Sequence, residues 1–350
     1  MSLEANAPPP RANPDLIGHE PVEAILRQNF DAHRLPHALL LSGPRGIGKA
    51  TLAFRLARYV LSAPDEDAPL DMFDAPATPE TGLAVSPESG VFRRVAAGGH
   101  ADLLTIERAY DPRRKRLRSE IVVDDAREIG AFLRLTPAEG GWRVVIVDGA
   151  DEMNRNAANS LLKILEEPPR RTLLILVAHG AGRLLPTIRS RTRHVPLSPL
   201  PDAMVIDLLG RYCPDLDGEA ARAIMALAEG SIGRALELAI SGGVELSNAL
   251  TAMLGRRGGV DVAGLHGFAE RLARVDAEEN YRTLEELLRQ QLARRAIDAA
   301  RRGARGEADR WARVRAEIGE QFARADGLNL DKKQTIMEAI FAIEQVASAA

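Results

Sequence analysis

The sequence is poor in cysteine and has no long apolar run. Cys213 is the single cysteine among 350 residues, which excludes an internal disulfide and a multi-cysteine metal site. No uninterrupted apolar stretch approaches the ~20 residues needed to span a bilayer, and the N-terminus lacks the basic start and apolar run of a signal peptide. We therefore expect no membrane association, and the cytoplasm is the predicted compartment.

The charge balance also lacks an excess of either sign. Lys and Arg number 46 and Asp and Glu 49, giving a formal net charge of −3, so the chain as a whole presents no field that attracts nucleic acid. Contact with DNA would have to come from a local basic patch or from partner subunits. The most basic run, residues 113–118, has no interleaved aromatic residue, which favours a solvated loop over phosphate contact.

The seven histidines are scattered, with no pair at metal-ligand spacing, so the sequence indicates no metal site. Hydrophobic residues make up 45% and charged residues 27%, the balance of a soluble globular protein. The length exceeds that of one compact core, so two or three domains are expected.

The order of apolar runs predicts an α/β fold. Residues 1–14 are rich in Pro, Ala and Asn and are predicted to be a flexible lead-in. Short apolar strands are predicted at 37–42, 103–107, 143–148 and 173–178. Helices are predicted before the first strand at 21–32 and between the strands at 49–61, 124–135 and 156–166. This alternation predicts a parallel sheet covered by helices on both faces.

Two other regions lack strand signals. Residues 63–99 show neither helical nor strand period and are predicted to be an irregular insertion. After Pro199 the pattern is helical, with breaks at 213–215 and 230–233, a composition boundary at 242–243, and the clearest helices at 281–299 and 332–346.

A phosphate-loop pattern occupies residues 43–50, between the first predicted strand and the helix that follows. Gly43, Gly46 and Gly48 allow backbone N–H groups to converge on an anion, and Lys49 can reach the outer phosphates. Ala50 stands where the motif has the serine or threonine that binds magnesium, and Thr51 lies roughly 100° further around the helix. The pattern indicates phosphate-loop ancestry and leaves open whether ATP or ADP still binds.

A second signal is Asp148, an acid at the end of an apolar strand, where phosphate-loop ATPases place the carboxylate that orients magnesium. The next position is Gly149 instead of a second acid, so the general base is missing. Such a base is worth about 10² to 10⁴ in rate. The alternative interpretation of Asp148 is a helix-capping acid.

A third signal is the alternation of Arg189, Arg191 and Arg193 after the strand at 173–178. In an extended segment these side chains would lie on one side. An arginine at a subunit edge can reach the γ-phosphate held by a neighbour, and such fingers contribute about 10³ to 10⁵ in rate. The alternative is a solvated basic edge.

Together these residues resemble the delta-prime family of bacterial DNA polymerase III clamp loaders. The similarity covers nearly the whole chain, in the stretches 35–40, 43–50, 141–148, 153–169, 184–191, 227–236 and 329–334. It implies an AAA+ phosphate-loop domain with a parallel sheet over 15–196, a small helical lid over 197–242, and an all-helical oligomerisation domain over 243–350.

The resemblance also implies roles for individual residues. Arg191 corresponds to the family's finger, which acts on a neighbouring ATPase subunit, with Thr192 replacing the usual cysteine. Arg234 corresponds to the second-sensor arginine of the lid, with a packing role as the alternative. The degenerate nucleotide site is then formed by Gly43, Gly46, Gly48, Lys49, Thr51, Asp148 and Arg234. Many relatives bind zinc through four cysteines aligned with 86–97. This chain has none there, so no zinc and no required cofactor are expected.

The function implied by the resemblance is that of a stator-like subunit. Partners would be gamma/tau-type ATPase subunits and the delta subunit, and the assembly would load the sliding clamp onto primed DNA within the polymerase holoenzyme. Ala50 and Gly149 predict that the chain has no ATPase activity of its own. Two alternatives stay open: a self-sufficient AAA+ ATPase or remodelling enzyme, and a scaffold without a finger.

Overall fold

The computed structural model describes residues 6–63, 82–111, 116–139, 141–254, 260–274 and 277–348. They form two compact units. The α/β unit comprises Asn6–Tyr212 and Ala228–Arg234, and the helical unit contains Cys213–Leu227 and Ala235–Ala350. The predicted lid, residues 197–242, contributes to both units. The predicted boundaries at 196 and 242 stay predictions.

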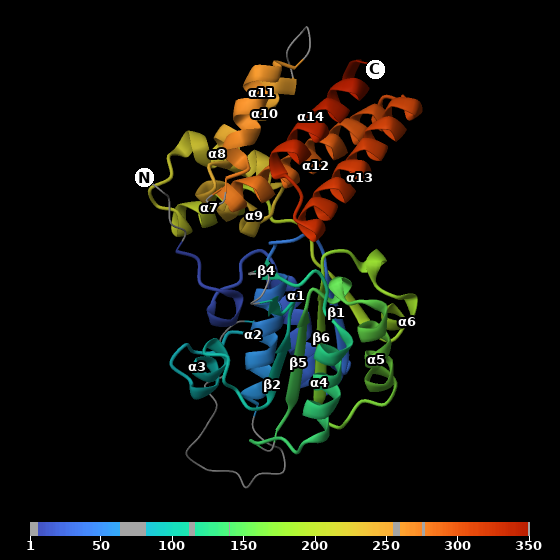
Figure 1. Ribbon diagram of the computed structural model, residues 1–350. Coiled ribbons are helices and arrows are strands. Elements are labelled where there is room, and N and C mark those ends of the chain that lie inside the picture. Colours follow the sequence, from blue (N-terminus) through green and yellow to red (C-terminus); the bar gives the residue numbers. More distant parts are fainter. Residues whose placement is uncertain are drawn as a thin grey trace. The chain divides into compact units, whose positions relative to one another are not determined.

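A five-stranded parallel sheet forms the centre of the α/β unit, in the order β2-β5-β6-β1-β7 (Figure 1). The strands are β1 (Ala38–Ser42), β2 (Leu103–Ile106), β5 (Arg143–Asp148), β6 (Thr172–Ala178) and β7 (Arg193–Pro196). The first four confirm the predicted strands. The fifth, β7, was not predicted, because it is a short edge strand whose residues are largely exposed, so it carries no apolar run.

A two-stranded antiparallel ribbon, β3 (Tyr110–Asp111) with β4 (Arg116–Leu117), lies outside this sheet. The rest of the predicted basic run, 113–115, lies outside the described residues.

Helices cover both faces of the sheet, as the continuous apolar strands predicted. Leu39 and Leu41 point into one core with α1 (Glu20–Asp31), α2 (Lys49–Leu61) and α3 (Gly90–Ala96). Leu40 points into the opposite core with α4 (Val123–Arg134), α5 (Arg155–Glu166) and α6 (Pro186–Arg189). Because successive side chains of a strand alternate, each apolar strand supplies both cores. This arrangement confirms the predicted α/β fold with a parallel sheet between two layers of helices.

The N-terminal segment, predicted to be a flexible lead-in over residues 1–14, is described from residue 6, and its flexibility stays a prediction. It contains a short 3₁₀ helix, Pro10–Ala12, and it is bound by two buried arginines of α2. Arg58 donates hydrogen bonds to the carbonyls of Arg11 (2.8 Å) and Asn13 (2.7 Å), and Arg55 donates to the carbonyl of Pro14. The composition of the segment gave no sign of these contacts, because the arginines that make them lie more than 40 positions further along the chain.

The predicted irregular insertion also contains a helix. Residues 64–81 lie outside the described residues, but α3 forms at Gly90–Ala96, with the hydroxyl of Ser89 accepting a hydrogen bond from the Phe92 backbone N–H (3.1 Å). Phe92 and Val95 are buried, and the Arg58 guanidinium lies 4.5 Å from the centre of the Phe92 ring. Two turns of helix are too short to produce a clear period in the sequence.

The remaining helices follow β7. They are α7 (Asp202–Tyr212), α8 (Gly218–Ala228), α9 (Ile232–Ile240), α10 (Gly243–Leu254), α11 (Val262–Leu272), α12 (Glu278–Arg301), α13 (Arg305–Leu328) and α14 (Lys332–Ser348). The helices predicted at 281–299 and 332–346 are confirmed as parts of α12 and α14. Within the helical unit, buried Tyr281 of α12 packs on Phe322 of α13, with ring centres 5.1 Å apart. No helix in the described part of the chain is long and apolar enough to cross a membrane.

Candidate functional site

The phosphate-like loop connects β1 to α2 at the carboxyl edge of the sheet. Gly43, Gly46 and Gly48 have φ angles of 151°, 75° and 101°, a region that side chains with a β-carbon rarely adopt. A β-carbon on Gly43 would lie 2.4 Å from the carbonyl oxygen of Leu197. The three glycines are therefore required by the path of the loop itself.

Lys49 is folded back onto its own loop. Its side chain is only 3% exposed, and Nζ donates hydrogen bonds to the carbonyls of Gly43 (2.8 Å) and Pro44 (2.5 Å). Burial lowers the pKa of Lys49 to about 8, although Asp148 and Asp151 favour its charged form. To bind a phosphate, the ammonium group would have to leave both carbonyls.

Asp148 ends β5, as predicted, and sits among other carboxylates. Burial raises the pKa of Asp148, and the neighbouring Glu107 raises it further, while Lys49 opposes both effects. Glu107 follows β2, so the sheet brings the ends of two strands together at this edge. The carboxyl group of Asp148 is therefore harder to ionise than that of an exposed aspartate.

Position 149, directly after Asp148, is a glycine and offers no side chain that could act as the general base. A β-carbon on Gly149 would lie 2.6 Å from Oε2 of Glu152, so Glu152 occupies the neighbourhood of the missing side chain. That carboxylate forms an ion pair with Arg108 at 2.8 Å. A paired carboxylate is a poor acceptor for the proton of an attacking water.

The magnesium side of the site is equally incomplete. Ala50 offers only a methyl group, and Thr51 is 8% exposed in the first turn of α2. Among the residues that the structure describes, no group of three or more His, Cys, Asp or Glu side chains is arranged to hold a metal ion.

His179 belongs to this edge and was missed in the sequence. It follows β6, and its backbone N–H and that of Gly180 donate to the two carboxylate oxygens of Asp151 (2.9 and 3.2 Å). Burial lowers the pKa of His179 to about 4, with Lys49 lowering it further, so its imidazole is neutral at pH 7. The available signal was positional: a polar residue directly after an apolar strand lies at the carboxyl edge of a parallel sheet.

A turn of the predicted lid packs on the loop within the α/β unit. The Ser231 hydroxyl donates to the carbonyl of Arg45 (2.8 Å), and the Gly233 N–H donates to the carbonyl of Gly46 (2.8 Å). The residue that faces the loop here is Gly233, while Arg234, the predicted second sensor, is the next residue of α9 and is half-buried.

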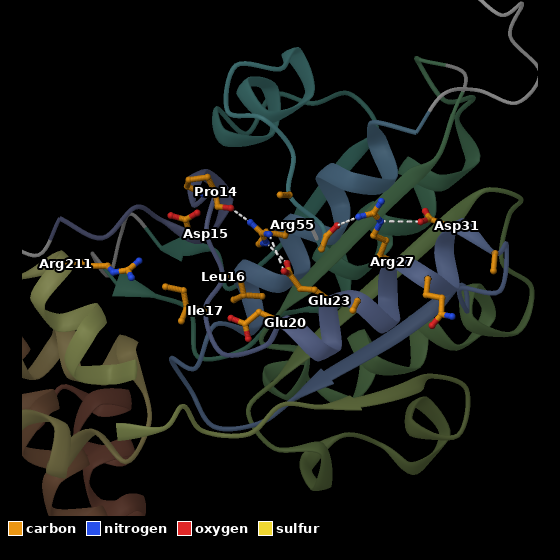
Figure 2. Close-up of a pocket in the computed structure, with 15 residues that line it drawn as sticks. Pro14, Asp15, Leu16, Ile17, Glu20, Glu23, Arg27, Asp31, Arg55 and Arg211 are labelled. Carbon is orange, nitrogen blue, oxygen red and sulfur yellow. Dashed lines mark hydrogen bonds and ion pairs between the residues drawn. The ribbon is translucent and has the colours of Figure 1, made fainter. Parts of the chain in front are cut away.

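A cavity of about 1010 Å³ lies beside α1 and the segment from Pro14 to Ile17 (Figure 2). Its charged side chains pair with one another: Arg55 Nε lies 2.5 Å from Glu23 Oε1, and Arg27 Nε lies 3.4 Å from Asp31. Next to it, the imidazole of His19 donates to the carbonyl of Ile47 (2.7 Å). This hydrogen bond connects the start of α1 to the phosphate-like loop.

Arg191 lies at the other edge of the sheet. The three arginines do not meet the condition for lying on one side, because the segment is not extended throughout: Arg189 ends α6, Arg191 lies in a turn, and Arg193 begins β7. Arg193 is level with Leu39 in the parallel pairing, which leaves about 13 Å of strand between this level and the loop at Gly43. Arg191 precedes Arg193 and is further still from the loop.

The Arg191 guanidinium is exposed but has contacts. Nη2 lies 2.7 Å from Oε1 of Glu166, and Nη1 donates to the carbonyl of Thr187 (3.1 Å) and to the hydroxyl of Ser190 (3.3 Å). Thr192, which replaces the family's cysteine, donates its hydroxyl to the carbonyl of Ile188 (3.1 Å). The turn that carries Arg191 is therefore ordered by local hydrogen bonds.

Comparison with known proteins identifies relatives of this chain. It is 37% identical over 196 residues to the DNA polymerase III subunit delta' of Pseudomonas aeruginosa, covering 56% of this chain and 53% of that protein. It is 32% identical over 286 residues to the DNA polymerase III subunit gamma/tau of Mycobacterium tuberculosis, covering 80% and 46%. The chain thus spans about half the length of the curated relatives it matches.

A solved structure, a DNA polymerase III gamma subunit-related protein of Thermotoga maritima, aligns with 93% of this chain and 98% of its own, at 19% identity and a TM-score of 0.39. The sequence model of the family described as "DNA polymerase III, delta subunit" matches residues 18–201. Since this match covers more than half of the chain, the protein belongs to the DNA polymerase III delta-subunit family.

Proposed function

We propose that this chain is a delta-prime-type stator subunit of the DNA polymerase III clamp loader. In this proposal it acts in the cytoplasm with gamma/tau-type ATPase subunits and a delta subunit, and helps them to load the sliding clamp onto primed DNA. Arg191 acts as the finger that completes the ATP site of a neighbouring subunit. The family match and the delta' and gamma/tau relatives support the assembly.

The observation that carries the proposal is the position of Arg191 relative to the loop of its own chain. The loop lies at the carboxyl edge of the sheet and Arg191 precedes the amino end of β7, so the arginine cannot reach a phosphate bound at Gly43 and Lys49. If Arg191 acts on a phosphate, that phosphate is therefore one bound to another subunit. A finger supplied in trans would raise the rate of ATP hydrolysis on that subunit by about 10³- to 10⁵-fold.

The contacts and residue types of the chain's own nucleotide site also support a stator role. Lys49 bonds to its own loop, Ala50 offers magnesium no hydroxyl, and position 149 carries no base. We infer that the chain needs no cofactor of its own and contributes to ATP turnover only in the assembly. The residues Gly43, Gly46, Gly48, Thr51, Asp148 and Arg234 then have structural roles inherited from a nucleotide site.

ATP turnover by the purified chain tests this proposal against the rival AAA+ ATPase. We expect no turnover above that of a Lys49→Ala control, and turnover when the chain is combined with its cognate gamma/tau-type and delta subunits. Steady hydrolysis by the isolated chain that Lys49→Ala abolishes would overturn the stator assignment. A complex that turns over ATP equally well without this chain would overturn its place in the assembly.

A further inference from the structure

Glu166 forms an ion pair with the Arg191 finger, and its position is unfavourable without a partner. It is the last residue of α5, where the backbone carbonyls at the helix C-terminus repel negative charge. Its Oε1 lies 2.7 Å from Arg191 Nη2. A cation therefore stabilises Glu166 at this helix end, and Arg191 supplies it.

Arg191 in turn is held at three points on its own chain. Besides Glu166, its Nη1 donates to the Thr187 carbonyl and the Ser190 hydroxyl, so three of its five N–H groups are directed toward its own chain. The two side chains remain 36% and 50% exposed, so the ion pair can open without moving the backbone.

We propose that Glu166 restrains the finger, holding Arg191 on its own chain until the transition state forms on the neighbouring subunit. This inference rests on the proposed role of Arg191. A finger accelerates a reaction by interactions that are stronger in the transition state than in the ground state. If Arg191 rests on Glu166 in the ground state, leaving that carboxylate is part of the barrier, and removing the negative charge lowers the barrier.

The exposure of the Glu166–Arg191 ion pair limits how far the pair can change the rate of ATP turnover. Ion pairs this exposed change an equilibrium by about 1.4- to 5-fold, far less than the finger's own contribution. Glu166 thus moderates the rate without blocking it. Glu166→Gln is expected to raise ATP turnover by the reconstituted complex about two- to fivefold, a gain that damage to the structure would not produce.

The control variants separate this effect from others. Glu167→Gln removes the same charge one residue along, from an exposed side chain, and is expected to leave turnover unchanged. Glu166→Gln in the background of Arg191→Ala should also have no effect, because the restrained group is gone. On the isolated chain, an arginine-selective dicarbonyl reagent should modify Arg191 faster in Glu166→Gln than in wild type, with exposed Arg193 as the internal reference.

Each other outcome has a definite meaning. If Arg191→Ala lowers turnover but Glu166→Gln matches Glu167→Gln or lowers turnover, the restraint is refuted and the finger stands. A gain that persists with Arg191→Ala, or an unchanged rate of Arg191 modification, refutes the restraint as well. If Arg191→Ala itself leaves turnover unchanged, the proposed function fails first.

Discussion

Gly233 lies so close to Gly46 that a β-carbon on Gly233 would come within 2.8 Å of the Gly46 α-carbon. The Gly233 N–H donates to the Gly46 carbonyl at 2.8 Å, and Ser231 adds a hydrogen bond to the carbonyl of Arg45. No side chain fits between the two backbones. The start of α9, with Ser231 before it, is thereby fixed on the phosphate-like loop.

Gly233→Ala should destabilise the protein by about 1–3 kcal/mol, because the new methyl group forces two hydrogen-bonded backbones apart. Urea unfolding at pH 7 measures the change. Gly130→Ala is the matched control: Gly130 lies inside α4 with nothing within 4 Å of its β-carbon position, so alanine should stabilise that helix by up to about 1 kcal/mol. Equal stability of Gly233→Ala and wild type would contradict the close approach.

The buried ammonium group of Lys49 predicts a pH-dependent stability. Folding lowers its pKa from 10.5 to about 8, so between these values the unfolded chain binds more protons than the folded one. The free energy of unfolding therefore gains a contribution that rises from pH 8 to 10.5 and is absent below pH 8. Relative to Lys49→Met, wild type should gain about 1–3 kcal/mol over this range.

Urea unfolding of both proteins at pH 7.5, 9 and 10 measures this difference, since titration of other groups cancels between them. Lys163→Met, which removes an exposed lysine of α5, serves as the control and should show a smaller pH-dependent difference. A wild-type minus Lys49→Met difference that is flat with pH, or that falls as pH rises, would show that Lys49 is not buried as an ammonium group.

The contacts of Arg58 predict the stability of the N-terminal segment. Arg58 is 1% exposed and donates to the carbonyls of Arg11 and Asn13, so Arg58→Met should cost about 1.5–3 kcal/mol and release residues 6–14. Trypsin cleavage after Arg11 should then become at least about tenfold faster, since 1.4 kcal/mol of lost protection is already tenfold.

Mass spectrometry of the early digestion products follows that cleavage. Arg34→Met, at an exposed position after α1, should leave the rate unchanged. If Arg11 is cut equally fast in wild type and Arg58→Met, the two carbonyl contacts do not hold the segment in solution.

Long elements with a strong period could be predicted from the sequence nearly to the residue. The helix predicted at 49–61 is α2, and the strand predicted at 143–148 is β5. Both bury most of their length, and most of the buried residues are apolar, which gives the sequence a clear pattern. By contrast, β7 and α6 are four residues each, and their formation depends on β1 and α5 rather than on a local pattern.

The site was predictable only where the backbone itself demands a residue type. Gly43, Gly46 and Gly48 are required by positive φ angles, which is why the loop stands out in the sequence. His179 and Glu166 reach their partners through tertiary contacts that no spacing encodes. The same holds for residues 6–14, whose order depends on arginines more than 40 positions away.

The most direct test of a finger acting in trans is ATP turnover by the reconstituted complex with Arg191→Ala. Arg189→Ala and Arg193→Ala, which remove exposed arginines two residues to either side, are the controls. Turnover at the site that borders this chain should fall by about 10³ or more with Arg191→Ala alone, without loss of assembly. Unchanged turnover, or an equal fall in all three variants, would contradict the account.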